Sequence, residues 1–210
     1  MKKTRLVKIS WLIKVGRLSP MSPTALISEK IGIKWLMMFD DEYVYGPTPG
    51  IVEIADLLVS QLKPKTVIDL FGGSGALSKL ALRRNVEKVI YVDLYPDAAT
   101  LNLKECRGIE IVKQDALKFI EKDGIYCDLL FVDPPEELID EVLSKIGRMR
   151  RMIKKAGLIW IGSSDVAKRR IRRIRRHKAI TFINAWGDAF MITWKPGFGE
   201  KIERIKQIIG

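Results

Sequence analysis

The sequence TVIDLFGGSG, residues 66–75, joins a short apolar run to a glycine-rich turn, and a helical pattern follows it. A glycine turn between a buried strand and a helix lets a ligand approach the backbone closely. The amides at the start of such a helix bind polar or anionic groups. A tight turn with a purely structural role is the alternative. The stretch therefore predicts a strand–turn–helix unit of an α/β sheet, with a candidate ligand site at the turn.

Around this stretch, short β-branched runs alternate with helical patterns. Each apolar run is about five residues long and nearly continuous, as in parallel strands buried on both faces. The predicted strands are Thr66–Leu70, Lys88–Asp93, Ile109–Lys113, Cys127–Asp133 and Leu158–Gly162. The predicted helices are 75–84, 96–106, 115–122, 136–155 and 165–177. This alternation predicts a doubly wound, Rossmann-like α/β sheet.

The C-terminal end breaks the alternation. Two strand-like runs, Ala179–Trp186 and Ala189–Trp194, flank Gly187-Asp188 and predict an antiparallel hairpin, which a helix over 199–209 follows. The expected sheet therefore has seven strands, five parallel plus the hairpin. This pattern differs from a sheet of six parallel strands.

The N-terminal end, residues 1–45, predicts a small extension that is a candidate for substrate binding. Two strands are expected in it, Leu6–Val15 and Ile33–Phe39, with a loop at residues 19–23 between them. Residues 46–210 then form the main domain, whose first helix is expected at about 51–62.

Acidic residues follow the predicted strands at regular places. Asp69 precedes the glycines, and Asp93 ends the second strand, where a carboxylate can accept bonds from both hydroxyls of a ribose. Asp115 follows the third strand and Asp133 ends the fourth. Ligands of open α/β sheets bind along the edge formed by the carboxyl ends of the strands. These four side chains are therefore expected to line one site.

Together the four segments resemble motifs I to IV of class I S-adenosylmethionine-dependent methyltransferases, and the terminal hairpin is similar to the last two strands of that fold. The resemblance covers roughly residues 46–195 and implies S-adenosylmethionine as the cofactor. It assigns Gly73 and Gly75 to two of the three motif I glycines, with Phe71 in place of the first. The cofactor-binding residues that it implies are Pro47, Thr48, Asp69, Phe71, Gly73, Gly75, Asp93, Leu94, Asp115, Ala116 and Asp133.

The resemblance also implies a role for each of these groups. Asp69 would hold the methionine ammonium, directly or through water, and Asp93 would hold the ribose. Asp115 and the Ala116 amide would face the adenine. The segment 46–49, which contains Pro47 and Thr48, would help to cradle the methionine carboxylate.

Asp133-Pro134-Pro135 resembles the Asp-Pro-Pro-aromatic motif of methyltransferases that modify amino groups of nucleic-acid bases. In those enzymes the acid and the following carbonyl accept hydrogen bonds from the acceptor nitrogen, and positioning supplies most of the acceleration. Asp133, Pro134 and Pro135 are therefore the expected catalytic residues. A rigid strand-to-helix turn is the structural alternative.

The aromatic residue of that motif is replaced here by Glu136. The exchange is interpreted either as an acid that complements the helix dipole or as a group that attracts a cationic amine such as lysine. A stacking partner for a flipped base would then come from elsewhere, with Tyr95, Trp160 and Trp186 as candidates. Trp160 lies in the middle of a predicted strand, so core packing is its default interpretation.

The net charge of +12 is concentrated in two blocks. Residues 1–18 carry six basic and no acidic side chains, and residues 145–178 carry 14 basic and one acidic. Such blocks favour a polyanionic partner, although a solvated arginine-rich helix or a membrane-surface helix has a similar composition. The candidate nucleic-acid-binding residues are Arg148, Arg151, Arg169, Arg172, Arg173, Arg175 and Arg176.

These observations lead to one predicted function, the S-adenosylmethionine-dependent N-methylation of an RNA base, a guanine or adenine nitrogen of tRNA or rRNA. The segment 93–98 is also similar to archaeal tRNA guanine methyltransferases. The alternatives are a protein lysine methyltransferase and a non-catalytic RNA-binding subunit. Two cysteines and one histidine predict no metal site. The absence of a long apolar run predicts a cytoplasmic protein without a membrane partner, and only six Asn and Gln suggest a hyperthermophile.

Overall fold

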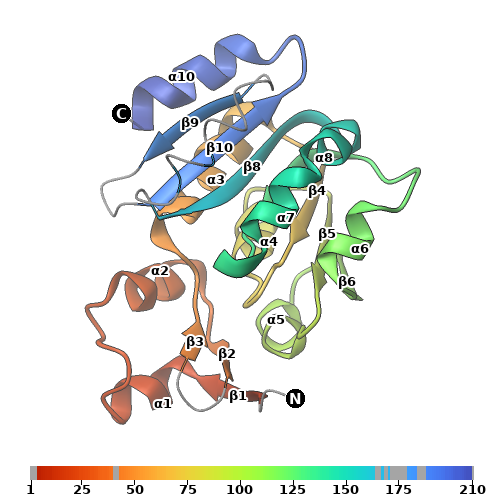
Figure 1. Cartoon of the computed structure of the whole chain (residues 1–210). Coiled ribbons are helices and arrows are strands. Elements are labelled where there is room, and N and C mark those ends of the chain that lie inside the picture. The colour runs from red at the N-terminus through yellow and green to blue at the C-terminus, as the bar shows by residue number, and fades with distance from the viewer. Residues whose placement is uncertain are drawn as a thin grey trace.

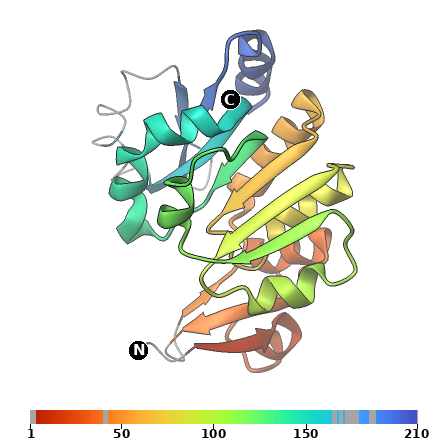
Figure 2. The same ribbon diagram turned by 90° about the vertical axis from the view of Figure 1, so that its right-hand side faces the viewer.

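The structure is a computed structural model that describes residues 4–39, 43–163, 167, 170, 179–183 and 188–209. Two β-sheets lie in this part of the chain, one of three strands and one of seven. Figures 1 and 2 show the small N-terminal sheet, in red and orange, at one end of the large one. No helix among the described residues has the length and apolar character needed to cross a membrane.

The large sheet has the strand order β6-β5-β4-β7-β8-β10-β9. Its first five strands are parallel, and β10 is antiparallel to both β8 and β9. The strands are β4 (Thr66–Leu70), β5 (Lys88–Asp93), β6 (Ile109–Lys113), β7 (Cys127–Val132), β8 (Ile153–Ser163), β9 (Ala179–Ile183) and β10 (Asp188–Trp194). The predicted seven-stranded sheet with a C-terminal antiparallel hairpin is confirmed.

Helices cover both faces of this sheet. The helices α3 (Pro49–Leu62), α4 (Ala76–Arg83) and α10 (Gly199–Ile209) enclose a first core, to which β4, β7, β8 and β10 contribute Val67, Phe131, Leu158 and Phe190. The helices α6 (Ala116–Ile120), α7 (Ile139–Ser144) and α8 (Ile146–Met152) enclose a second core on the opposite face. Burial on both faces explains why these strands are nearly continuous apolar runs.

The predicted helix 136–155 is wrong in its extent. The chain instead forms a 3-10 turn, η1 (Glu136–Leu138), and then α7 and α8, and β8 begins at Ile153. Ile153 is buried and pairs with Cys127 of β7, so strand pairing prevails over continuation of the helix. The predicted helix 165–177 lies outside the described residues except at Ala167 and Arg170.

The N-terminal extension differs from the expectation in two ways. Its strands β1 (Thr4–Lys8), β2 (Trp35–Phe39) and β3 (Tyr43–Tyr45) form the three-stranded antiparallel sheet, but the run after Lys8 is the helix α1 (Ile9–Lys14). The helix α2 (Pro23–Ile31) begins inside the predicted loop. Ser22 caps α2 by accepting a hydrogen bond from the Ala25 amide, and Pro23 occupies the first helical position.

Asn102, in α5 (Asp97–Leu103), joins the two sheets. Its side-chain oxygen accepts hydrogen bonds from the amides of Lys34 and Trp35, and its Nδ2 donates to the carbonyls of Trp35 and Ser74. The residue is 6% exposed. Buried hydrogen bonds of this kind fix geometry because an unsatisfied partner is costly. The start of β2 is therefore fixed relative to the glycine turn.

Candidate functional site

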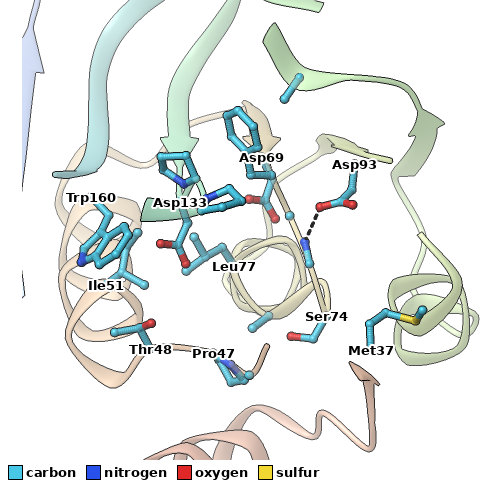
Figure 3. A pocket seen from close by; sticks show the side chains of 18 of the residues that line it. Met37, Pro47, Thr48, Ile51, Asp69, Ser74, Leu77, Asp93, Asp133 and Trp160 are labelled. Atoms are coloured by element: carbon cyan, nitrogen blue, oxygen red, sulfur yellow. Dashed lines mark hydrogen bonds between the residues drawn. The ribbon is translucent and has the colours of Figure 1, made fainter. Parts of the chain in front are cut away.

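A cavity of about 1210 Å³ opens at the carboxyl ends of the parallel strands (Figure 3). The start of α3 and residues Thr4 and Met37 of the N-terminal sheet complete its wall. Every predicted cofactor-binding or catalytic residue except Gly75 lines it, namely Pro47, Thr48, Asp69, Phe71, Gly73, Asp93, Leu94, Asp115, Ala116, Asp133, Pro134 and Pro135. The strand ends thus bring together residues that lie far apart in the sequence.

The turn after β4 has an unusual backbone. Phe71, Gly73 and Gly75 have φ angles of 58°, 51° and 80°, in the left-handed region. Glycine adopts this region at little cost, whereas Phe71 does so only because its surroundings hold it there. Gly75 does not line the cavity and lies against the side chains of Ala99 and Leu103. Its role is to let α4 begin close to α5.

Gly72, which sequence reasoning did not single out, allows the closest approach in the turn. A Cβ at this position would lie 2.3 Å from Cε2 of Tyr91. Tyr91 is fully buried and donates a hydrogen bond from its hydroxyl to the Gly73 carbonyl, at 2.8 Å. Its ring and hydroxyl therefore hold the turn against β5.

Asp69 lies at the bottom of the cavity and is fully buried. Its Oδ2 accepts hydrogen bonds from the Ser78 amide at 3.0 Å and the Ser78 hydroxyl at 2.6 Å. No described group donates to Oδ1. Desolvation raises the pKa of Asp69 from its usual 3.8 to about 7, against the lowering effect of the Ser78 bonds. A buried carboxylate with one open oxygen suits a cationic ligand.

Asp93 ends β5 on the neighbouring side of the cavity. Its Oδ2 accepts a hydrogen bond from the Gly73 amide at 3.0 Å, drawn in Figure 3, and its Oδ1 accepts one from the Tyr95 amide at 2.8 Å. Burial raises the pKa of Asp93, and these amides oppose the shift. Each carboxylate oxygen has further lone pairs, which suit a sugar diol.

The other expected cofactor contacts lie around this pair. Asp115 caps α6 by accepting a hydrogen bond from the Leu117 amide at 2.8 Å. Asp115 and Ala116, the first residue of α6, both line the cavity. Thr48 and Pro49 begin α3, with Pro49 at the first helical position. The start of α3 thus presents its first turn to the cavity, opposite the strand ends.

Asp133 directly follows β7, and its amide donates to the Leu70 carbonyl at 3.3 Å. Within the described ranges, no group donates a hydrogen bond to its carboxylate. Desolvation, together with the charges of Asp69 and Asp188, raises the pKa of Asp133 to about 7. The group is therefore an open acceptor that titrates near neutral pH.

The two prolines and the acids after them form the cavity rim. Pro134 is buried, and the Pro135 carbonyl accepts a hydrogen bond from the Leu138 amide, which starts η1. Glu136 and Glu137 line the cavity and are exposed. The predicted helical turn after the prolines is therefore present as a 3-10 turn, with its two acids facing solvent.

Two further lining residues are Trp160 of β8 and Asp188 of β10. Trp160 packs only partly against the first core, and its Nε1 donates to Asp188 Oδ1 at 3.3 Å. Core packing was the default expectation for Trp160, and no sequence signal singled out Asp188. Only the pairing of β10 with β8 brings the two side chains together. Of the other aromatic candidates, Tyr95 lies beside Asp93 and is 43% exposed, and Trp186 lies outside the described residues.

The predicted basic surface is described only in part. Arg148 forms an ion pair with Asp123 at 2.8 Å and donates to the backbone carbonyl of Glu121, so part of its hydrogen-bonding capacity is used within the protein. Arg151 is exposed. Outside the described residues lie Arg169, Arg172, Arg173, Arg175 and Arg176.

The site fits the cofactor that the sequence resemblance implies. The open oxygen of Asp69 and the carboxylate of Asp93 are within one cavity, and the negative charge suits a sulfonium and an ammonium group. Among the described residues, no three His, Cys, Asp or Glu side chains are arranged to hold a metal ion.

Comparison with known proteins identifies the sequence over residues 41–182 with the family described as conserved hypothetical protein 95. A similar solved structure is the putative methyltransferase yhhF from Escherichia coli, 17% identical, with a TM-score of 0.53 over 71% of this chain and 87% of that chain. The SAM-dependent methyltransferase from Agrobacterium tumefaciens is 19% identical, with a TM-score of 0.56 over 77% and 67%.

The ribosomal protein L11 methylase from Lactobacillus delbrueckii subsp. bulgaricus is 16% identical, with a TM-score of 0.58 over 75% of this chain and 89% of that chain. No curated protein matches the sequence significantly. At these identities the structural likeness establishes the fold, an α/β Rossmann-like sheet with a C-terminal antiparallel hairpin.

Proposed function

The chain belongs to the family described as conserved hypothetical protein 95 and is an S-adenosylmethionine-dependent methyltransferase, and we propose that it methylates a nitrogen of an RNA base. The observation that carries this proposal is the open carboxylate of Asp133 in the cavity, next to Trp160 on the neighbouring strand. An amino nitrogen needs such an acceptor, and a planar base has a face that suits an aromatic neighbour.

The protein's own residues mainly position the reactants. When bound, the cofactor supplies an activated methyl group on a sulfonium. Asp133 accepts a hydrogen bond from the acceptor nitrogen and so orients its lone pair, and the Pro134 carbonyl is the second acceptor. Because the pKa of Asp133 is raised to about 7, this carboxylate also takes up the proton that the nitrogen releases and passes it to solvent.

The N-terminal extension supports RNA as the acceptor. Between residues 4 and 39 six side chains are basic and one, Glu29, is acidic. Arg5 lies over the Trp11 ring at 5.2 Å, and Lys8 lies over the Trp35 ring at 5.0 Å. Arg5 and Lys8 are exposed, and Thr4, at the start of the same strand, lines the cavity. Basic side chains that lie over aromatic rings, on the extension that contributes Thr4 and Met37 to the cavity wall, suit single-stranded nucleic acid.

Transfer of a labelled methyl group tests the proposed acceptor. Tritiated S-adenosylmethionine is offered separately to tRNA, rRNA, DNA and total protein from cells that lack the modification. We expect label in an RNA fraction, and we expect the Asp133→Ala variant to lose it while it still binds the cofactor. Label only in DNA or protein, or cofactor binding without transfer to any fraction, contradicts the proposal.

The salt dependence of binding tests the RNA surface independently. Replacing Arg5 and Lys8 by alanine should reduce the slope of log affinity against log salt by about 0.7 for each phosphate that the variant no longer neutralises. Lys201→Ala in α10 is the control, since this lysine is also exposed but does not line the cavity. An equal slope in all three proteins contradicts a role for this surface.

A protein amine is the second candidate acceptor, and one observation favours it. Glu136 and Glu137 are exposed at the cavity rim, where they would attract a cationic lysine side chain. In that case the label enters protein, and the Glu136→Gln and Glu137→Gln exchanges raise KM for it. An RNA acceptor should instead bind equally well or better after the same exchanges, because repulsion of phosphates decreases.

A further inference from the structure

Four side chains of the cavity come from four neighbouring strands of the large sheet. Asp69, Asp133, Trp160 and Asp188 belong to β4, the end of β7, β8 and β10, which are neighbours in this order. Figure 3 shows Trp160, Asp133 and Asp69 in sequence across the cavity. A group bound by Asp133 would therefore have Asp69, the expected partner of the cofactor, on one side and the indole of Trp160 on the other.

The register of the strands places Trp160 beside Asp133. In the parallel pair of β7 and β8, Val132 lies opposite Ile159, so the next residues along are Asp133 and Trp160. Leu158 points into the first core and Ile159 into the second, so alternation directs Trp160 to the face of the sheet on which the first core lies. Trp160 is the one aromatic residue of β8, and its side chain both packs against the first core and lines the cavity.

Asp188 determines how the indole of Trp160 is oriented. The pairing of β10 with β8 shifts between Ala189 and Phe190, so that Phe190 lies opposite Trp160 and Ala189 lies opposite Gly162. Such a bulge redirects a side chain. It brings the Asp188 carboxylate within 3.3 Å of the indole Nε1, which holds the ring by its polar edge and leaves its carbon faces for packing.

We propose that Trp160 is the stacking wall for the planar acceptor base and that Asp188 is the positioning residue that holds its indole. This inference rests on the proposed function, because it names the side chain that recognises the base. Trp160 would thus supply the aromatic neighbour of Asp133 that the motif loses when Glu136 replaces its aromatic residue.

The other aromatic side chains of the cavity are less suitable. Phe71 packs against the second core, on the opposite face of the sheet from Trp160. Tyr95 follows β5 at the end of the cavity where Asp93 lies, two strands away from β7. Among the described residues that line the cavity, Trp160 is therefore the aromatic residue placed next to Asp133.

Substitution of Trp160 tests the wall. We expect Trp160→Leu to raise KM for the methylated RNA fraction roughly 10-fold, since base–aromatic stacking has about that effect, while Trp160→Phe retains most of the affinity. The Kd for S-adenosylmethionine should stay within about twofold, which also shows that the variants fold. Trp194→Phe, in β10 but outside the cavity lining, is the matched control. An unchanged KM in Trp160→Leu overturns the inference while RNA methylation by the wild type upholds the proposed function.

Fluorescence tests the same contact without turnover. Guanosine and adenosine 5′-monophosphate are titrated into the protein saturated with S-adenosylhomocysteine. A stacked base should quench the tryptophan fluorescence that Trp160 contributes. This quenching should therefore be absent in Trp160→Phe and unchanged in Trp194→Phe. Absence of quenching overturns the stacking wall. Quenching combined with methyl transfer only to protein supports the wall and contradicts the proposed RNA function.

The role of Asp188 has its own variants. Asp188→Ala removes the acceptor for the indole N–H, whereas Asp188→Asn keeps an acceptor oxygen and removes the charge. We expect Asp188→Ala to raise KM about threefold with kcat nearly unchanged, and Asp188→Asn to restore the wild-type KM and quenching. Equal loss in both variants, or a fall in kcat alone, overturns positioning through the indole and indicates a direct role for the charge.

Discussion

The two ends of the cavity differ in how their carboxylates are bonded. At the end formed by β4 and β5, Asp69 and Asp93 accept four hydrogen bonds from Ser78, Gly73 and Tyr95. At the end formed by β7, β8 and β10, no described group donates to Asp133, and Asp188 accepts from the side chain of Trp160. Hydrogen bonds within the protein therefore fix the carboxylates of the first end, whereas the carboxylate of Asp133 at the second end is available to a ligand. A shaped end suits an invariant cofactor, and an open end suits the reacting nitrogen.

The largest expected effect is at the open end. Asp133→Asn keeps the shape of the side chain but removes the anionic acceptor, so we expect kcat to fall about 100-fold, because a misplaced acceptor nitrogen costs about that much. The Kd for S-adenosylmethionine, measured by calorimetry, should change less than about threefold. If cofactor affinity falls as much as kcat, the two ends are not separate in function.

A smaller effect is expected at the shaped end. Asp93→Ala removes the diol acceptor and should raise the Kd for S-adenosylmethionine roughly 10–100-fold, the effect of a hydrogen bond to a charged group. Asp97→Ala is the control, because Asp97 is exposed in the first turn of α5, four residues further along. Equal affinity in the two variants means that Asp93 shapes the turn but does not hold the cofactor.

The shape of the turn itself depends on Gly72. A Cβ there would lie 2.3 Å from the Tyr91 ring, so we expect Gly72→Ala to lower the free energy of unfolding by about 1–3 kcal/mol. Gly147→Ala in α8 meets open space and replaces a helical glycine, so it should be neutral or stabilising by up to about 1 kcal/mol. Denaturant unfolding compares the two. Similar values for both glycines contradict a tightly packed turn.

The smallest expected effect concerns pH. Because the pKa of Asp69 is raised to about 7, this group is protonated below neutral pH, when it cannot pair with an ammonium group. Cofactor affinity should therefore rise by up to about tenfold between pH 6 and pH 7 and level off above pH 7. In Asp69→Asn this rise should be much reduced, because the proposed partner of the ammonium group no longer titrates.

The stability of the free protein should depend on pH in the opposite sense. The folded pKa values of Asp69 and Asp133, both about 7, exceed the unfolded value of 3.8. Their stabilising contribution is complete below pH 4 and is lost as the pH rises to about 7. Asp69→Asn should make Tm less dependent on pH in that window, and an unchanged dependence contradicts the raised pKa.

The sequence predicted the sheet well where one local pattern was decisive. The bounds of β4, β5 and β6 agree with the prediction residue for residue, because each strand is a short apolar run that ends at a turn. It failed for residues 136–155, where the apolar positions have helical spacing but Ile153 pairs with β7. The helical spacing of apolar residues cannot show at which residue the helix ends and pairing with another strand begins.

The candidate site divides in the same way. Asp69, Asp93, Asp115 and Asp133 could be found from the sequence, because each follows a strand and the ends of parallel strands share one edge. Trp160 was one of three candidate stacking residues, with core packing as its default interpretation, and the sequence did not single out Asp188 or Asn102. Their roles depend on contacts between segments that lie far apart in the chain, such as the bond from Trp160 to Asp188.

The sequence by itself therefore determined the fold class, the five parallel strands with a C-terminal hairpin, and the acids that meet at the carboxyl ends of the strands. These follow from local propensity and from the geometry that all parallel sheets share. Only the tertiary structure decided that β10 brings Asp188 to Trp160, that Asn102 fixes the N-terminal sheet to the glycine turn, and which carboxylates remain open. Hydrogen bonding and burial between distant segments set these features, and no local pattern encodes them.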